Sequence, residues 1–264
     1  VILVEKHKMG GDCLNTGCVP SKALIRSAKV ASYLKRSKEF GLGEVNPTVE
    51  FSHVMERVQN VIKQIEPHDS IERFTELGVD CIQGEAKILS PYCVEVNGEK
   101  ITTRNIIIAT GARPFVPPIE GLQDVGYLTS DNLWNIRQQP KRLVVLGGGP
   151  IGCELSQAFA RLGSDVIQIE QAPRLMIRED EKVSRLGDDG VNICTSHQAV
   201  KVEVRNGIKT LICRHNEQWV EFAFDEILVA VGRAANTQNM GLEDVGVELS
   251  ERGTISVNDY LQTS

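Results

Sequence analysis

The spacing of apolar positions predicts helices in the N-terminal part of the chain. A helix is predicted over residues 21–40, because Pro20 is suited to a first helical turn. A second helical stretch is predicted over residues 51–77, where apolar side chains recur at every third or fourth position. Pro67 interrupts this pattern and Gly78 ends it.

Continuous apolar runs predict strands elsewhere. These runs cover residues 1–5, 106–108, 143–146, 166–169 and 227–231. The β-branched run at 106–108 is typical of a parallel strand that is buried on both faces. A small antiparallel layer is predicted from short strands at 80–83, 86–88, 93–96 and 100–103, and further strands are predicted at 199–204, 209–214 and 219–224. Strands and helices in this order predict an α/β protein.

A glycine-rich turn separates the strand at 143–146 from an apolar-periodic helix at 153–162. The next strand, 166–169, ends in Glu170, and Arg174 follows shortly after. Strand, glycines, helix, strand and acid in this order predict a dinucleotide site, with the pyrophosphate at the helix N-terminus. The residues expected to contact the nucleotide are Gly147, Gly149, Pro150, Ile151, Gly152 and Glu170.

The identity of the acid determines which nucleotide is expected. Glu170 would accept hydrogen bonds from the adenosine ribose hydroxyls and repel a 2′-phosphate, so NAD is favoured over NADP. Arg174 is close enough in sequence to weaken this preference.

Two cysteines, Cys13 and Cys18, lie just before the predicted helix at 21–40, and Lys22 follows Cys18 by four residues. A thiol at a helix N-terminus near a cation ionises readily, so the pair is a candidate dithiol/disulfide redox centre. Two buried structural cysteines are the alternative. We expect no metal, because no C-x2-C or H-x3-H pair completes the four ligands of a zinc site.

Composition narrows the class of protein. The chain has 264 residues, 41% of them hydrophobic, and a net charge of −6, which argues against nucleic acid as a partner. No apolar run reaches the length of about 18 residues that a membrane span needs. An odd number of cysteines, seven, does not fit a secreted disulfide framework, so a reducing cytoplasmic location is expected.

The segment GGDCLNTGCVPSKAL, residues 10–24, resembles the active-site motif of the pyridine nucleotide–disulphide oxidoreductases. This flavoprotein family includes dihydrolipoamide dehydrogenase and mercuric reductase, the branch that the chain resembles most. The resemblance extends to ATG-x-x-P at 109–114 and VGR-x-x-NT at 231–237. It implies FAD and NAD as cofactors, a small-molecule or protein-bound disulfide as substrate, and a homodimer for the full-length protein.

The resemblance also implies roles for individual residues. Cys13 would be the interchange thiol that meets the substrate, and Cys18 the charge-transfer thiol that faces the flavin. Glu154, otherwise an acid suited to an early helical position, would pair with Lys22 beside the flavin and the nicotinamide. Asp12 departs from the family, in which many members have threonine.

Further residues are implied to bind cofactors. Glu5 would contact the adenosine ribose of FAD, although it could also be a surface acid on an ordinary strand. Arg233 would hold a cofactor phosphate or cap a loop, and both readings stay open. Pro150 stands where relatives often carry a bulkier residue that gates the nicotinamide site. The remaining implied contacts are Gly11, Asp12, Lys22, Ala86, Thr110, Gly111 and Gly232.

We therefore predict two Rossmann-like FAD/NAD(P)-binding units, with the NAD domain inserted into the FAD domain. Residues 1–125 are expected to form most of the FAD domain, without its first strand and glycine loop. Residues 126–250 would form the NAD(P)-binding domain, and residues 251–264 would return to the FAD domain. A C-terminal dimerisation domain is expected to be absent, since no histidine has a glutamate five positions later.

The predicted activity is electron transfer between NAD(H) and the Cys13–Cys18 pair through FAD. The expected acceptor is lipoamide or dihydrolipoamide, or a Hg(II)-type species. The alternative is a nucleotide-binding, redox-sensing module without substrate turnover. Residues 180–190 are shorter than the corresponding helix of the family. Either the protein has lost a helix there or disordered residues are omitted from the sequence, and we favour omission.

Overall fold

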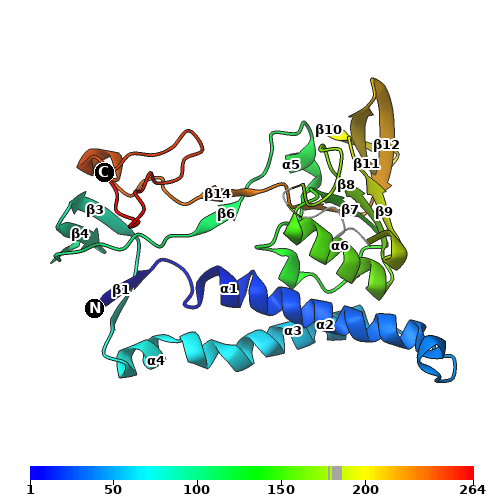
Figure 1. Cartoon of the computed structure of the whole chain (residues 1–264), viewed down its shortest axis with the longest axis horizontal. Helices are drawn as coiled ribbons and strands as arrows, with labels where there is room; N and C mark the ends of the chain where they lie inside the picture. Colours follow the sequence, from blue (N-terminus) through cyan, green and yellow to red (C-terminus); the bar gives the residue numbers. More distant parts are fainter. Residues whose placement is uncertain (178, 180–185) are drawn as a thin grey trace. The chain divides into compact units, whose positions relative to one another are not determined.

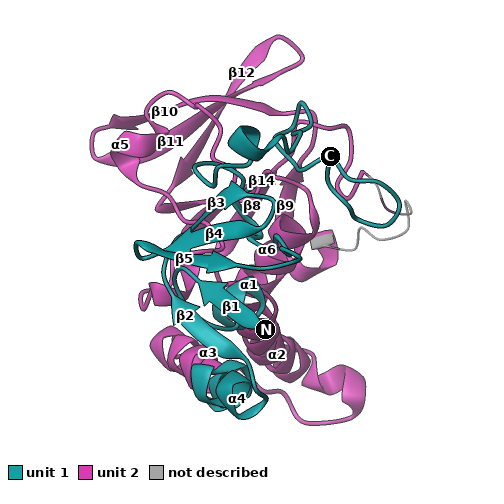
Figure 2. Cartoon of the chain, turned by 90° about the vertical axis from the view of Figure 1, so that its left-hand side faces the viewer, with its two compact units in different colours: residues 1–15, 63–113, 233–264 teal, residues 16–62, 114–232 magenta. Residues whose placement is uncertain are grey.

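The computed structural model describes residues 1–177, 179 and 186–264, and it confirms the α/β class. Most of the segment 180–190, which is shorter than the corresponding helix of the family, lies outside these residues. The chain forms two compact units (Figure 2). Unit 1 comprises Val1–Asn15, Lys63–Arg113 and Arg233–Ser264, and unit 2 comprises Thr16–Ile62 and Pro114–Gly232. The two units are defined by contacts within the chain and not by bound cofactors. The predicted boundaries of the FAD and NAD(P) domains therefore stay a prediction.

A four-stranded parallel sheet is the centre of unit 2. Its order is β13 (Glu226–Val229), β7 (Arg142–Leu146), β8 (Asp165–Ile169) and β9 (Val191–Cys194). Three of these strands are predicted from the sequence, although β13 ends two residues earlier than expected. The helix α6 (Pro150–Leu162) connects β7 to β8 and packs along the sheet (Figure 1).

Two long helices complete this core. α2 (Cys18–Lys35) packs against α6, and α3 (Phe51–Ile65) joins the same cluster through residues such as Met55. The helix predicted over 21–40 is wrong at both ends. It starts at Cys18 and stops at Lys35, where a separate 3-10 turn, Ser37–Phe40, leads to Gly41 in a left-handed conformation. The helix before it, α1 (Gly11–Asn15), is not predicted.

A three-stranded antiparallel sheet, all of it predicted, also belongs to unit 2. It consists of β10 (Gln198–Arg205), β11 (Ile208–His215) and β12 (Gln218–Phe224). The short helix α5 (Leu122–Val125) packs on β10. At Gly121, before α5, an added Cβ would lie 2.0 Å from the carbonyl oxygen of Val202, so this approach requires glycine.

The predicted antiparallel layer is wrong in its first strand, residues 80–83, because this strand belongs to a parallel pair in unit 1. β1 (Ile2–Glu5) pairs in parallel with β2 (Asp80–Gln83). The antiparallel sheet therefore contains only β3 (Ala86–Ser90), β4 (Cys93–Val96) and β5 (Glu99–Thr102). Short local turns set the antiparallel pairing, whereas the partner of β2 is about 75 residues away and cannot be read from local pattern.

Pro67 interrupts the second helical stretch as predicted. α3 ends at Ile65, a 3-10 turn follows at Glu66–Asp69, and α4 spans Ile71–Glu76. Ser70 caps α4, because its hydroxyl accepts a hydrogen bond from the backbone N–H of Arg73 at 3.2 Å.

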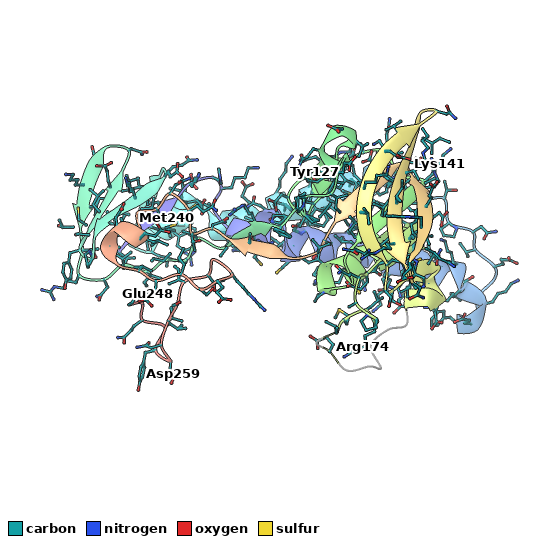
Figure 3. The ribbon with its side chains drawn as sticks, turned by 90° about the horizontal axis from the view of Figure 1, so that it is seen from above. Tyr127, Lys141, Arg174, Met240, Glu248 and Asp259 are labelled. Atoms are coloured by element: carbon teal, nitrogen blue, oxygen red, sulfur yellow. The ribbon has the colours of Figure 1, made fainter. Side chains whose placement is uncertain are left out.

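The strand predicted at 106–108 is wrong. This segment has no regular secondary structure and pairs with no strand of the described residues, and Ile107 is 90% exposed. Its neighbours Ile106 and Ile108 pack against the small cluster of Ile88, Leu242 and Val247. Met240, which is labelled in Figure 3, packs against the same cluster. An apolar run becomes a strand only where another strand supplies hydrogen bonds, and none does so here.

Short elements complete the fold. β6 (Ala112–Pro114) pairs with β14 (Arg233–Ala235). Three further 3-10 turns are Leu133–Asn135, Leu186–Asp189 and Glu243–Val245.

Candidate active site

The glycine-rich turn between β7 and α6 combines two kinds of glycine. Gly147 has a φ of +111°, and a Cβ there would lie 2.3 Å from the carbonyl oxygen of Ala230. A Cβ at Gly152 would lie 2.2 Å from the carbonyl oxygen of Gly147. A Cβ at Gly149 would meet no atom of the described residues within 4 Å. Gly147 and Gly152 are therefore required by the fold, whereas Gly149 leaves room for a ligand.

The N-terminus of α6 faces this turn. Gly149 is the N-cap residue, Pro150 occupies the first turn, and in the part of the chain that is described no side chain caps the helix. The first amides of an uncapped helix carry partial positive charge and bind anions such as phosphate. The amides of Ile151 and Gly152 can therefore meet a pyrophosphate.

Glu170, at the end of β8, is fixed against the glycine-rich turn. Its Oε2 accepts a hydrogen bond from the backbone N–H of Gly148 at 2.5 Å, and its Oε1 accepts one from Ala172 at 2.6 Å. A carboxylate has about four acceptor positions, so these two bonds leave capacity for ribose hydroxyls.

Arg174 is held by the backbone rather than directed at Glu170. Its guanidinium donates to the carbonyl oxygens of Met176 at 3.2 Å, Ile177 at 2.7 Å and Glu179 at 2.9 Å (Figure 3). These bonds tie the Arg174 guanidinium to carbonyl oxygens that lie two, three and five residues after it in the sequence.

Lys22 and Glu154 are in contact, as the sequence predicts. Lys22 lies in the second turn of α2 and Glu154 in the second turn of α6, and the lysine Nζ lies 2.9 and 3.0 Å from the two carboxylate oxygens. The side chains are 61% and 42% exposed, so the pair contributes at most about 1 kcal/mol to stability. Its consequence is positional: it joins the helix that begins at Cys18 to the helix that begins at the glycine-rich turn.

Trp134 is a site residue that sequence reasoning missed. Its side chain is 3% exposed, and its indole N–H donates to the carbonyl oxygens of Thr16 at 3.1 Å and Ser130 at 2.6 Å. This bond anchors the chain two residues before Cys18, which is exposed at the first position of α2. A buried tryptophan needs an acceptor for its N–H, but the sequence does not show that the acceptor lies 118 residues away.

Cys13 lies on α1 in unit 1 and is also exposed. The turn before it is tight, since a Cβ at Gly10 would lie 2.4 Å from the Cδ2 of Leu14. Asn15 closes the helix by donating to the carbonyl oxygens of Met9 at 2.9 Å and Gly11 at 3.0 Å. A disulfide between Cys13 and Cys18 stays a prediction.

The two other family-like segments meet each other in unit 1. The hydroxyl of Thr110 donates to the carbonyl oxygen of Asn236 at 2.6 Å, and the amide of Asn236 donates to the carbonyl oxygen of Thr110 at 3.0 Å. Gly111 accepts a further bond from the backbone N–H of Asn236 at 3.0 Å. Arg233, next to Gly232, donates to the carboxylate of Asp12 and to the carbonyl oxygen of Ala112. Arg233 thus holds a loop here, and its contact with a cofactor phosphate stays a prediction.

Glu5 stands at the carboxyl end of β1. Its Oε1 accepts a hydrogen bond from the backbone N–H of His7 at 2.8 Å, and it borders a small cavity at the ends of β1 and β2. Ala86 is the first residue of β3. The residue before it, Glu85, pairs with Lys6, whose ammonium lowers the pKa of the Glu85 carboxylate. The cavity is lined by Glu5, His7, Met9, Ile71, Cys81, Ile82 and Gln83.

Residues 1–264 match the pyridine nucleotide-disulphide oxidoreductase family. The chain belongs to this family. The resemblance predicted from the cysteine motif is therefore confirmed, and the family is one of flavin-dependent, pyridine-nucleotide-linked oxidoreductases.

Relatives of known function lie in two branches of the family. The chain is 34% identical over 269 residues to mercuric reductase of Staphylococcus aureus, covering 100% of this chain and 49% of that protein. It is 37% identical over 276 residues to dihydrolipoyl dehydrogenase of Acholeplasma laidlawii, covering 100% and 79%. The chain spans about half the length of the mercuric reductases that it matches.

A solved structure gives the same fold. The Cu(II) complex of the HOCl-induced flavoprotein disulfide reductase RclA from Escherichia coli is 28% identical, with a TM-score of 0.85. The match covers 100% of this chain and 58% of that one.

Two of the remaining thiols, Cys153 and Cys213, are unsuited to redox chemistry. Burial raises the pKa of Cys153, whose Sγ lies 3.4 Å from the carbonyl oxygen of Gly148. Burial, with Cys194 nearby, raises the pKa of Cys213 to about 12. Both thiols are therefore protonated and unreactive near neutral pH.

Two features are absent from the described residues. No cluster of three or more histidine, cysteine or acidic side chains there could hold a metal ion. None of the helices described is both long and apolar enough to cross a membrane.

Proposed function

We propose that the complete protein transfers electrons between NAD(H) and the Cys13–Cys18 pair through FAD. The acceptor would be lipoamide or dihydrolipoamide, or a Hg(II)-type species, in keeping with the two groups of relatives. The proposal includes a homodimer for the full-length protein and a cytoplasmic location.

The observation that carries this proposal is the contact between Lys22 and Glu154. It ties the Cys18 end of α2 to the glycine-rich end of α6, and each end has independent features of a redox or nucleotide site. An exposed ion pair contributes little to stability, so its place between two chemically specialised helix ends favours a functional role.

The residues present fit both cofactors. For NAD, Gly149 leaves open space, the α6 amides face it, and Glu170 keeps acceptor capacity for a ribose. For FAD, Glu5 borders a cavity at the carboxyl ends of two parallel strands, where α/β folds bind ligands. The bound flavin would supply two-electron chemistry between the nicotinamide and the thiols.

The side chains of the protein would orient the reactants and handle charge. Cys13 would meet the acceptor as a thiolate, and Cys18 would close the disulfide as electrons leave the pair. Lys22, held by Glu154, would keep a positive charge in the second turn of the helix that begins at Cys18.

The preference for NADH over NADPH would come from Glu170. A 2′-phosphate would meet its carboxylate, which we expect to reduce specificity for NADPH by about ten- to a hundredfold. Arg174 does little to relieve this repulsion, since it donates to three backbone carbonyls. Glu170→Ala should narrow the ratio of kcat/KM for the two nucleotides, and an unchanged ratio would show that Glu170 does not select.

The proposed electron path can be tested with the full-length holoenzyme. Cys13→Ser should abolish reduction of lipoamide or Hg(II) while NADH still reduces the flavin. Lys22→Met should slow flavin reduction and disturb the flavin–thiolate absorbance together. Lys29→Met is the matched control, because this lysine lies on the same helix over the ring of Tyr33.

The outcomes separate catalysis from redox sensing. Turnover of either acceptor that depends on Cys13 supports the enzyme. Reversible oxidation of the thiols with no turnover of lipoamide or Hg(II) would instead support a nucleotide-binding sensor. Unchanged half-reactions in Lys22→Met would contradict the role of the ion pair.

A further inference from the structure

Asp12 introduces a charge at the residue that precedes the candidate interchange thiol in the sequence. It precedes Cys13 on α1, and its carboxylate is 54% exposed. Many members of the family have an uncharged threonine at this position, so the Asp12 carboxylate adds a negative charge that those members lack.

Arg233 supplies a counter-charge from a distant part of unit 1. Its guanidinium, which is 31% exposed, donates to the carboxylate of Asp12 and also to the carbonyl oxygen of Ala112. The arginine begins β14 and Ala112 begins β6, so the bonds tie the Cys13 helix to this strand pair.

We propose that Asp12 and Arg233 form a charge-balanced latch that sets the reactivity of the Cys13 thiol. Both would be positioning residues that act through Cys13, and this role rests on the proposed function only in treating Cys13 as the reactive thiol. A second consequence is that Asp12 competes with a cofactor phosphate for Arg233.

The direction of the effect follows from charge. A nearby cation favours the thiolate, and a nearby anion disfavours it. In the intact latch the two charges largely cancel at Cys13. Removing the carboxylate leaves the positive charge of Arg233 unbalanced at this end of α1, and removing the guanidinium leaves the negative charge of Asp12 unbalanced there. The two removals should therefore change the reactivity of Cys13 in opposite directions.

The test measures the rate of alkylation of Cys13 by iodoacetamide at pH 7 in the full-length, reduced protein. Cys18→Ser serves as the parent, so that Cys13 is the only thiol in the tryptic peptide 9–22, which mass spectrometry quantifies. Asp12→Asn should raise the rate by about three- to tenfold, and Arg233→Gln should lower it by a similar factor. The double variant should return to within about twofold of the parent.

Two further variants separate charge from structure. Asp12→Thr removes the charge as Asp12→Asn does, and should also raise the rate. Arg233→Lys keeps the charge and should stay near the parent. Cys93, on β4 of the same unit, is the internal reference for general loosening.

A change of the same sign in Asp12→Asn and Arg233→Gln, or no change in either, would overturn the latch. If Arg233→Gln does not fold, an unchanged rate in both Asp12 variants overturns it by itself. Failure of the full-length protein to turn over lipoamide or Hg(II), with this alkylation pattern intact, would refute the proposed function and leave the latch standing.

Discussion

The parallel sheets of the two units start from similar apolar runs in the sequence, but they differ in the number of paired strands and in the burial of their side chains. In unit 2, Val144, Val145 and Ile227 are fully buried, and every strand of that sheet lies beside another. In unit 1, β1 pairs with β2 alone among the described residues, and Ile2 is 43% exposed.

The difference shows what an apolar run can and cannot specify. A run such as 106–108 carries the same β-branched residues as a buried strand, yet it has no regular secondary structure and remains unpaired among the described residues. Burial on both faces requires neighbouring strands and covering helices. In unit 2, α6 and the strands on either side of β7 supply them, whereas in unit 1 the described residues pair β1 with β2 alone and pack the short helix α4 against β2.

The largest effect is expected from truncating one side chain in the parallel sheet of unit 2, compared with one in the unpaired segment 106–108 of unit 1. Leu143→Ala, on β7, should lower the free energy of unfolding by about 2–5 kcal/mol, because the residue is 1% exposed and its loss leaves a cavity. Ile107→Ala should change it by less than about 0.5 kcal/mol, because this side chain is already 90% in solvent. Urea unfolding of both variants measures the contrast, and equal losses would show that 106–108 is buried in solution.

The glycine-rich turn of unit 2 allows a matched pair of substitutions. Gly147→Ala should cost about 2–3 kcal/mol, since its φ is +111° and its Cβ would meet a carbonyl oxygen. Gly149→Ala should leave stability nearly unchanged, because its Cβ would meet open space. Thermal unfolding compares the two.

The same pair tests the nucleotide site. Gly149→Ala should weaken NADH binding by at least tenfold, measured by titration of the folded variant. Unchanged binding would mean that the nucleotide does not approach the backbone at Gly149.

Trp134→Phe tests the anchor of the Cys18 helix. The ring would keep most of its packing, but the carbonyl oxygens of Thr16 and Ser130 would lose a donor. We expect a loss of about 1–2 kcal/mol in urea unfolding and faster hydrogen exchange at residues 16–20. Faster exchange across the whole of α2 would indicate general destabilisation instead.

The smallest effect is expected at the edge of the unit 2 sheet, where Asp225 pairs with Arg142. The guanidinium lowers the pKa of Asp225, so the pair stabilises the fold above the unfolded-state pKa of about 3.9. That contribution is lost as the pH falls through the lower pKa of the folded state. Asp225→Asn should cost less than about 1 kcal/mol at pH 7, because both side chains are more than a third exposed.

Stability curves at several pH values check this prediction. The difference between the parent and Asp225→Asn should shrink as the pH falls below about 4. A constant difference would mean that hydrogen-bond geometry, rather than charge, stabilises this edge. The exposed pair of Lys6 and Glu85 in unit 1 is the comparison, and Glu85→Gln should not measurably change the melting temperature.

Much of unit 2 could be predicted because its signals are local and mutually consistent. The strand at 143–146, the glycine-rich turn and Glu170 follow one another within a single supersecondary unit, and the structure places them as expected. The contact between Lys22 and Glu154 was predicted only through the family resemblance, since 132 residues separate them.

By itself, the sequence determined the α/β class, the nucleotide-type turn and the cysteine motif, because periodicity, glycine spacing and residue chemistry act over short stretches of chain. Tertiary structure alone decided that β2 pairs with β1, that 106–108 stays unpaired, that Trp134 holds Thr16 and that Arg233 binds Asp12. Each of these outcomes depends on which distant group supplies a hydrogen bond or a charge. The residue type shows that a side chain requires a hydrogen bond, an opposite charge or apolar packing. Only the folded chain determines which distant residue provides it.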